Sequence, residues 1–140
     1  MAATAGYSGI PLPRKLGIRE GDVVALLDAP EGIEALLAPL PDGVDLHRVD
    51  EVPDADVILY FTAERADLAT LVDDLARAIH PDGSLWVAWP KRASKVPTDM
   101  TEDVVREICL PLGLVDNKVC AIDATWSGLR LVWRVGLRGD

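Results

Sequence analysis

The sequence predicts one α/β domain with a Rossmann-like, three-layer architecture and a mostly parallel sheet that ends in an antiparallel hairpin. Two observations lead to this prediction. Short apolar segments alternate with segments of helical periodicity. The early strands are apolar on both faces, which is typical of parallel strands buried between two layers of helices. The 140 residues fit a single domain, with 1–21 as a lead-in and 22–135 as the core.

The first half of the core is predicted to run strand, helix, strand, strand. Asp22–Asp28 is continuously apolar between its acidic ends, and Glu31–Ala38 is a short helix that prolines end. Val44–Val49 and Asp56–Phe61 are the next two strands. A single helical turn at 12–16, closed by a glycine, is expected in the lead-in.

The second half begins with the longest predicted helix, Glu64–His80, in which apolar residues recur at i, i+3, i+4 and i+7. The turn at 81–83 leads to the strand Ser84–Trp89. Asp99 and Glu102 have the spacing of a capping box, so they are expected to begin the next helix.

The chain is predicted to end in two strands, Val115–Asp123 and Leu129–Val135, joined at 124–128. The last strand alternates strictly and places Leu131, Trp133 and Val135 on one face. If nothing in the chain covers that face, it would form a homodimer interface, and otherwise the protein is a monomer. The sequence leaves both states open.

Charge excludes several classes of partner. Asp and Glu number 23 against 14 Lys and Arg, for a net charge of −9. Such a chain is repelled by phosphate backbones and anionic lipid, so no nucleic-acid or membrane partner is expected. The sequence lacks a signal peptide and an apolar run of about 20 residues, which predicts a cytoplasmic protein. Cys109 and Cys120 are expected to be reduced and packed, although a disulfide between them stays open.

Open parallel sheets bind ligands beyond the carboxyl ends of their strands. We therefore expect a site where four loops meet: Ala29–Gly32, Thr62–Arg65, Pro90–Thr98 and Ala124–Gly128. The first loop lacks the G-x-G-x-x-G pattern of dinucleotide-binding folds. Its Pro30 has no N–H to donate, and carboxylates stand where a phosphate would bind, which argues against NAD.

The third loop holds three basic residues within five positions and no acid between Trp89 and Pro97. Such cations, with an aromatic wall and donors from the hairpin, would bind a carboxylate or phosphate. The alternative is a solvated loop beside tryptophans that are simply packed. The predicted ligand-binding residues are Lys91, Arg92, Lys95, Trp126, Ser127 and Arg130.

The order of helix, Pro-Asp-Gly turn, strand, helix and terminal hairpin resembles the later part of class I methyltransferases over residues 22–135. That resemblance implies the strand order 2-1-3-4-6-5 with only strand six antiparallel. It also implies S-adenosylmethionine as a cofactor. Acidic side chains near the site would favour the sulfonium cation of that molecule. Only one glycine remains after the first strand, which departs from the methyltransferase pattern. The candidate cofactor-binding residues are Asp28, Glu31, Gly32 and Asp50.

Four segments are similar to a bacterial family that is common in actinobacteria, the domain of unknown function 3052. They are Tyr7–Leu12, Lys15–Ile18, Asp82–Lys91 and Lys118–Arg130. The resemblance covers nearly the whole chain. It implies a bacterial protein and carries no activity.

The sequence offers no nucleophile in a G-x-S-x-G context and no metal-ligand spacing. His47 and His80 are interpreted as structural. We therefore favour a non-enzymatic module that needs no cofactor and binds a small anion or a protein partner. The alternative is a divergent S-adenosylmethionine-dependent enzyme resembling methyltransferases.

Overall fold

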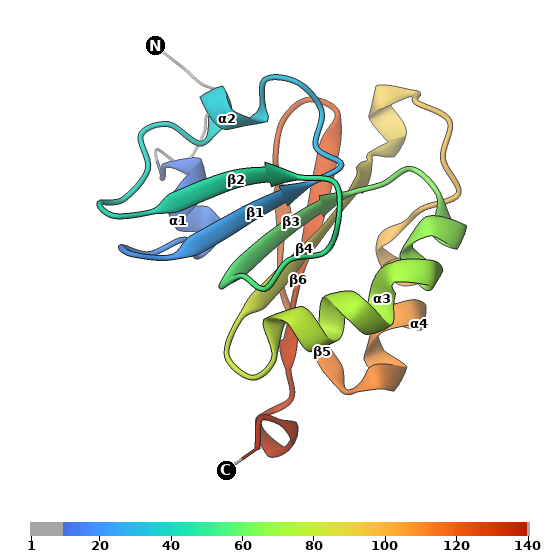
Figure 1. Ribbon diagram of the computed structural model, residues 1–140. Coiled ribbons are helices and arrows are strands. Elements are labelled where there is room, and N and C mark those ends of the chain that lie inside the picture. The colour runs from blue at the N-terminus through green and yellow to red at the C-terminus, as the bar shows by residue number, and fades with distance from the viewer. Residues whose placement is uncertain (1–9, 140) are drawn as a thin grey trace.

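The structure, a computed structural model, describes residues 10–139, so positions 1–9 of the expected lead-in lie outside the described residues. Six strands form one sheet in the order β2-β1-β3-β4-β6-β5 (Figure 1). Its first four strands are parallel, and β6 runs antiparallel to both β4 and β5. This confirms the expected order and directions. The bounds are β1 Val23–Leu27, β2 Asp45–Val49, β3 Val57–Phe61, β4 Ser84–Pro90, β5 Leu114–Ala121 and β6 Trp126–Trp133.

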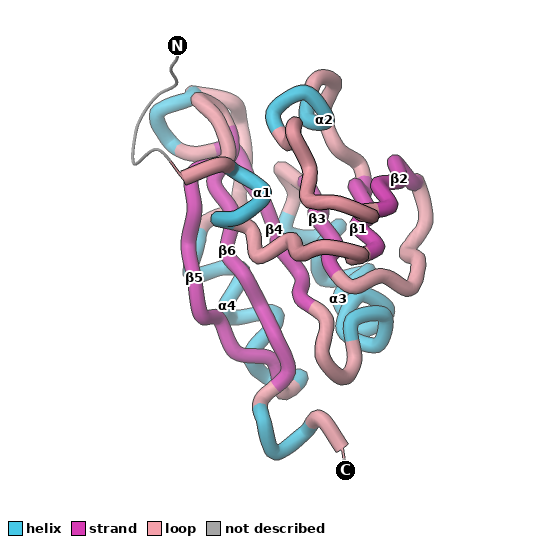
Figure 2. Tube along the Cα trace, turned by 90° about the vertical axis from the view of Figure 1, so that its left-hand side faces the viewer, coloured by secondary structure: helices cyan, strands magenta, loops and turns pink. Residues whose placement is uncertain are grey.

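Helices lie on both faces of the sheet, as predicted, but the two layers differ in thickness. α3 (Arg65–Ile79) and α4 (Glu102–Cys109) cover one face, whereas α1 (Leu12–Lys15) and α2 (Ile33–Leu36) are single turns on the other (Figure 2). α2 is shorter than expected because prolines follow it closely. Three 3-10 turns complete the described elements: η1 Arg92–Ser94, η2 Leu110–Leu112 and η3 Val135–Leu137.

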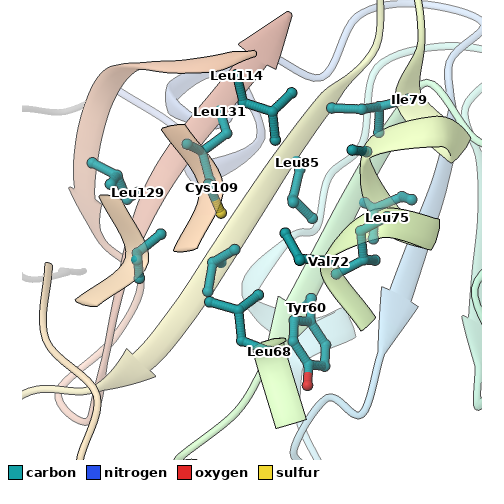
Figure 3. Close-up of a cluster of buried hydrophobic side chains, with 14 of the residues drawn as sticks. Tyr60, Leu68, Val72, Leu75, Ile79, Leu85, Cys109, Leu114, Leu129 and Leu131 are labelled. Atoms are coloured by element: carbon teal, nitrogen blue, oxygen red, sulfur yellow. The ribbon is translucent and has the colours of Figure 1, made fainter. Parts of the chain in front are cut away.

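The larger core lies between the sheet and the pair α3 and α4, where the apolar stripe of α3 meets β3, β4 and β6 (Figure 3). Leu131 is fully buried there, and the indole N–H of Trp133 donates to the Ala76 carbonyl at 2.8 Å. Val135 has left the strand for η3 and is 77% exposed. The expectation that these three residues share one face is therefore wrong, because Leu131 and Trp133 pack toward α3 whereas Val135 has turned away.

The smaller core lies under α1 and α2 on the opposite face. Trp86 of β4 is fully buried in it and donates its indole N–H to the Leu16 carbonyl at 2.9 Å. Gly17 follows α1 with a φ of +77°, a left-handed conformation that side chains rarely adopt. The predicted turn at 12–16 and its glycine stop are thus confirmed.

The predicted capping box of α4 is wrong. Thr101 is the N-cap, because its hydroxyl accepts a hydrogen bond from the Val104 N–H at 3.1 Å. The Asp99 carboxylate instead accepts from the Arg65 N–H at 2.7 Å, at the start of α3. Asp99 therefore caps the neighbouring helix, a contact between segments that local spacing does not reveal.

The two cysteines lie in different cores, Cys109 at the end of α4 and Cys120 on the α1 face, and both are free thiols. A disulfide between them is excluded by the sheet that separates them. Burial raises the pKa of the Cys109 thiol to about 12. Within residues 10–139, no helix is long and apolar enough to span a bilayer.

Candidate functional site

The carboxyl ends of the parallel strands form one rim, as predicted. Strand register brings Phe61 level with Ala88, and Pro90 level with Trp126. Hydrogen bonds then join one loop to the next: the Lys91 N–H donates to the Thr125 carbonyl at 2.8 Å. The Thr98 hydroxyl likewise donates to the Ala63 carbonyl at 2.6 Å. The loops after β3, β4 and β5 therefore make one connected surface.

The loop after β4 places Lys91, Arg92 and Lys95 together, and we call these three residues the basic loop. Lys91 is half-buried and the other two are exposed. The Ser94 hydroxyl donates to the Lys91 carbonyl at 2.7 Å and accepts from the Val96 N–H at 3.2 Å, which shapes the turn. None of the three cations forms an ion pair with a residue between 10 and 139.

Trp126 and Ser127 are the first residues of β6. The prediction that they belong to the loop 124–128 is therefore wrong. Trp126 stands at the rim and packs edge-on against Phe61, with ring centroids 5.3 Å apart. Ser127 pairs with Trp89, whose ring is in the core under α3 and α4. Because successive residues in a strand face opposite ways, Trp126 and Ser127 do not point into one pocket. Trp89 is 7% exposed, so of these two tryptophans only Trp126 stands at the rim.

Arg130 is not brought to the basic loop. It pairs with Trp86, four positions along β4 from Pro90, a separation of about 13 Å along the strand. Its side chain lies on the α1 face, next to Gly17. Arg130 therefore belongs to a different part of the molecule from the rest of the predicted anion site.

The four candidate cofactor residues gather at the other end of the rim. Asp28 and Asp50 directly follow Leu27 and Val49, which are paired neighbours in β1 and β2. Asp28 has a φ of +54°, so this aspartate adopts the left-handed conformation that a glycine would adopt more easily. The rim is thus acidic beside β1 and β2, and basic beside β4.

Arg48 of β2 is a rim residue that sequence reasoning missed. Its guanidinium donates to both oxygens of Glu34, at 2.9 and 2.7 Å, and to the carbonyls of Ala29 at 2.5 Å and Pro30 at 3.1 Å. The hydrogen bonds to Arg48 hold the pKa of the Glu34 carboxyl at about 2. Arg48 therefore occupies two carbonyl acceptors of the loop after β1.

Tyr60 is a second residue missed, because its strand looks uniformly apolar. Its side chain is fully buried, and the hydroxyl lies at the edge of the core cluster (Figure 3). Burial raises the pKa of Tyr60 to about 12, and the Asp67 and Asp28 carboxylates act in the same direction. Thr62 opposes the shift, but no hydrogen bond of normal geometry reaches the Tyr60 hydroxyl from residues 10–139.

Between residues 10 and 139, no group of three or more His, Cys, Asp or Glu side chains is arranged to hold an ion. Nε2 of His80 instead donates to the Leu137 carbonyl at 2.9 Å, and the ring packs edge-on against Trp133.

The sheet order and its rim define a Rossmann-like domain of the kind found in methyltransferases. The chain is similar to a candidate type 11 methyltransferase from Sulfolobus solfataricus, with TM-score 0.65 and 13% identity over 92% of this chain and 93% of that one. It is similar to magnesium protoporphyrin IX methyltransferase from Synechocystis, solved with bound SAH (TM-score 0.59, 12% identity, 82% and 75% covered). Fibrillarin from Methanococcus jannaschii gives TM-score 0.60 and 15% identity over 96% and 72% of the two chains. These likenesses show the fold alone.

The chain belongs to the family of proteins of unknown function DUF3052, whose profile matches residues 14–135. No curated protein sequence matches the chain.

Proposed function

We propose that the domain binds a small anion at the β4 end of its rim and catalyses no reaction on it. The observation that carries this proposal is the basic loop. Lys91, Arg92 and Lys95 have no acidic partner among residues 10–139, although the whole chain carries a net charge of −9. Three neighbouring cations repel one another, and a carboxylate or phosphate would relieve that repulsion.

The rim supplies the rest of such a site from rigid elements. The backbone of Lys91 is tied to the hairpin through Thr125, and Trp126 is fixed beside it by its contact with Phe61. A half-exposed indole face offers an apolar surface to the body of an organic anion. The loop after β1 is less available, because Pro30 lacks an N–H and Arg48 engages the loop carbonyls.

A second candidate is S-adenosylmethionine binding at the acidic end, by a divergent methyltransferase-like enzyme. Asp28 and Asp50 emerge side by side there, and the fold is shared with methyltransferases, including one solved with bound SAH. This candidate requires the loop after β1 to admit a ligand without the glycines that usually allow close approach.

A thermal-shift experiment tests both. For the first candidate, phosphate or sulfate at a hundredfold excess over Kd stabilises the parent by about 2.7 kcal/mol. The variant Lys91→Ala with Lys95→Ala, which we call the rim variant, loses the part of that shift that the basic loop contributes. The matched control, Arg77→Ala with Arg134→Ala, removes the same charge away from the rim, because Arg77 lies in the last turn of α3 and Arg134 directly follows β6. This control keeps the full response to phosphate. If the rim variant responds to phosphate as the control does, the basic loop is not the site.

The same experiment with S-adenosylhomocysteine addresses the second candidate. A shift that persists in the rim variant but is lost in Asp50→Ala would favour a methyltransferase-like cofactor site. No shift with either S-adenosylmethionine or S-adenosylhomocysteine would end that candidate.

A further inference from the structure

Lys118 of β5 and Arg130 of β6 share the face of the sheet that α1 borders. Arg19 and Arg138 lie near Arg130, because after burial their charges are the next causes that lower the pKa of its guanidinium. We call these four residues the basic face. Arg130 of β6 is paired directly across from Lys118 of β5. Like charges at such cross-strand positions destabilise a sheet. An acidic protein therefore concentrates positive charge on one patch.

Arg130 is the center of this patch and is partly withdrawn from water. Its Nε is buried and has no hydrogen-bond partner among residues 10–139. A Cβ placed on Gly17 would lie 3.5 Å from that Nε and 3.6 Å from Nη2, so the guanidinium rests against the α1 segment. Burial, followed by the repulsion from Arg19 and Arg138, lowers the pKa of Arg130.

Two carboxylates near these cations in the sequence, Asp116 and Asp22, are engaged elsewhere. Asp116 of β5 belongs to the opposite face, where it accepts from Nε of Arg106 at 3.1 Å. Asp22 accepts the backbone N–H of Arg19 at 2.8 Å. No ion pair involving Arg19, Lys118, Arg130 or Arg138 forms within residues 10–139.

Two of the surrounding cations are held in place by backbone acceptors. The Lys118 ammonium donates to the Lys15 carbonyl at 2.7 Å, and Nε of Arg138 donates to the Trp133 carbonyl at 2.9 Å. The charges are thus positioned without being neutralised. A half-buried, unpaired guanidinium among fixed like charges is costly unless a bound anion compensates it.

We propose that the basic face binds a small oxyanion of charge two or more, such as phosphate or a phosphorylated metabolite, with Arg130 as its central ligand. The planar guanidinium presents paired N–H donors that match a phosphate group. Arg19, Lys118 and Arg138 supply the surrounding positive charge. This site lies on a sheet face, away from the rim, and does not depend on the function proposed for the basic loop.

The test follows the Arg130 Nε–H resonance by NMR, assigned by its loss in Arg130→Met, during titration with inorganic phosphate or pyrophosphate at constant ionic strength. We expect a saturable shift of that resonance, which Lys91→Ala with Lys95→Ala leaves intact. By calorimetry, Arg130→Met should weaken binding at the basic face about tenfold or more, since a charge-assisted hydrogen bond is lost. The rim variant serves as the background, so that failure of one proposed site is separable from failure of the other.

A second readout needs no anion. Replacing an uncompensated, half-buried charge by an apolar side chain should leave the Tm of the unliganded protein unchanged or higher. Arg130→Lys keeps the charge but loses the paired N–H donors of the guanidinium. It should bind phosphate more weakly than the parent and more tightly than Arg130→Met. The proposal is overturned if phosphate and pyrophosphate leave the Arg130 resonance unmoved, or if Arg130→Met binds them like the background.

Discussion

Arg48 of β2 and Glu34 of α2 form a bidentate ion pair. Nε of Arg48 donates to Oε2 of Glu34 at 2.9 Å, and Nη2 donates to Oε1 at 2.7 Å. A helix of a single turn has little stability of its own. The pair therefore holds α2 and the preceding loop in place from a neighbouring strand. The same guanidinium also binds the carbonyls of Ala29 and Pro30, so one side chain defines the shape of the rim beside β1.

The Glu34 pair predicts a pH-dependent contribution to stability. Its carboxyl pKa falls from 4.5 to about 2 on folding, so the ionised form is favoured in the folded state. The stabilisation is fully present above about pH 4.5 and is lost as the pH falls toward 2. Glu34→Gln should therefore be less stable than the parent near neutrality, and the gap should close with acidification. Urea unfolding across this range measures it.

The control for Glu34 is Arg48→Met. Adding Glu34→Gln to Arg48→Met should introduce no further pH dependence, because the partner is already absent. A gap between parent and Glu34→Gln that stays constant down to about pH 3 would contradict the pairing.

Gly83 predicts a steric limit at the turn before β4. A Cβ there would lie 2.9 Å from the Ile79 carbonyl oxygen and 3.0 Å from that of Asp56, both backbone atoms that are already hydrogen-bonded. Gly83→Ala should lower the free energy of unfolding by about 2 kcal/mol, as overpacking does. Gly136→Ala meets nothing within 4 Å and should change it by less than about 0.5 kcal/mol. Equal effects in chemical denaturation would show that the crowding is absent.

Trp86 predicts how α1 is attached to the sheet. Trp86→Phe removes the only indole donor to the Leu16 carbonyl among the described residues and leaves a gap in a fully buried site. We expect a loss of about 2–3 kcal/mol in unfolding free energy. Trp133→Phe, at a half-buried site, should cost about 1 kcal/mol. If hydrogen exchange shows α1 equally protected in parent and Trp86→Phe, this anchor is unimportant.

We expect both cysteines to react slowly with a thiol reagent in the native state. Burial raises the pKa of Cys109 to about 12, and burial also raises that of Cys120. The thiolate is the reactive form, so both should resist a thiol reagent near pH 8 and react once the chain is unfolded. Rapid native labelling of both sites would contradict their burial. Equal electrophoretic mobility with and without reductant would confirm that no disulfide joins them.

Much of the architecture was predictable because it follows from local patterns. The apolar runs around Ala25, Ile58 and Val87 became the parallel strands between two helical layers, and the periodic stripe of 64–80 became α3. Strand ends were harder, as Trp126 illustrates. The sequence predicts it in the connection 124–128, but pairing with Pro90 extends β6 to include it.

The contacts that the sequence did not predict are mainly those between side chains of different segments. Asp99 has the spacing of a local cap, yet the structure aligns it with the N-terminus of α3 and leaves Thr101 to cap α4. Arg48 sits in an ordinary alternating strand, and nothing in the sequence pairs it with Glu34. Such contacts depend on the distance between segments after packing, which periodicity does not encode.

The sequence by itself determined the α/β class, the parallel strands, the loop after β1 without its glycines, and the three cations after β4. Those features arise from composition and spacing along the chain. Only the tertiary structure decided which charges meet: it joined Arg48 to Glu34 and moved Arg130 from the expected rim to the face beside Gly17. The physical reason is that strand register and face alternation set where a long side chain can reach, and both are settled only when the sheet assembles.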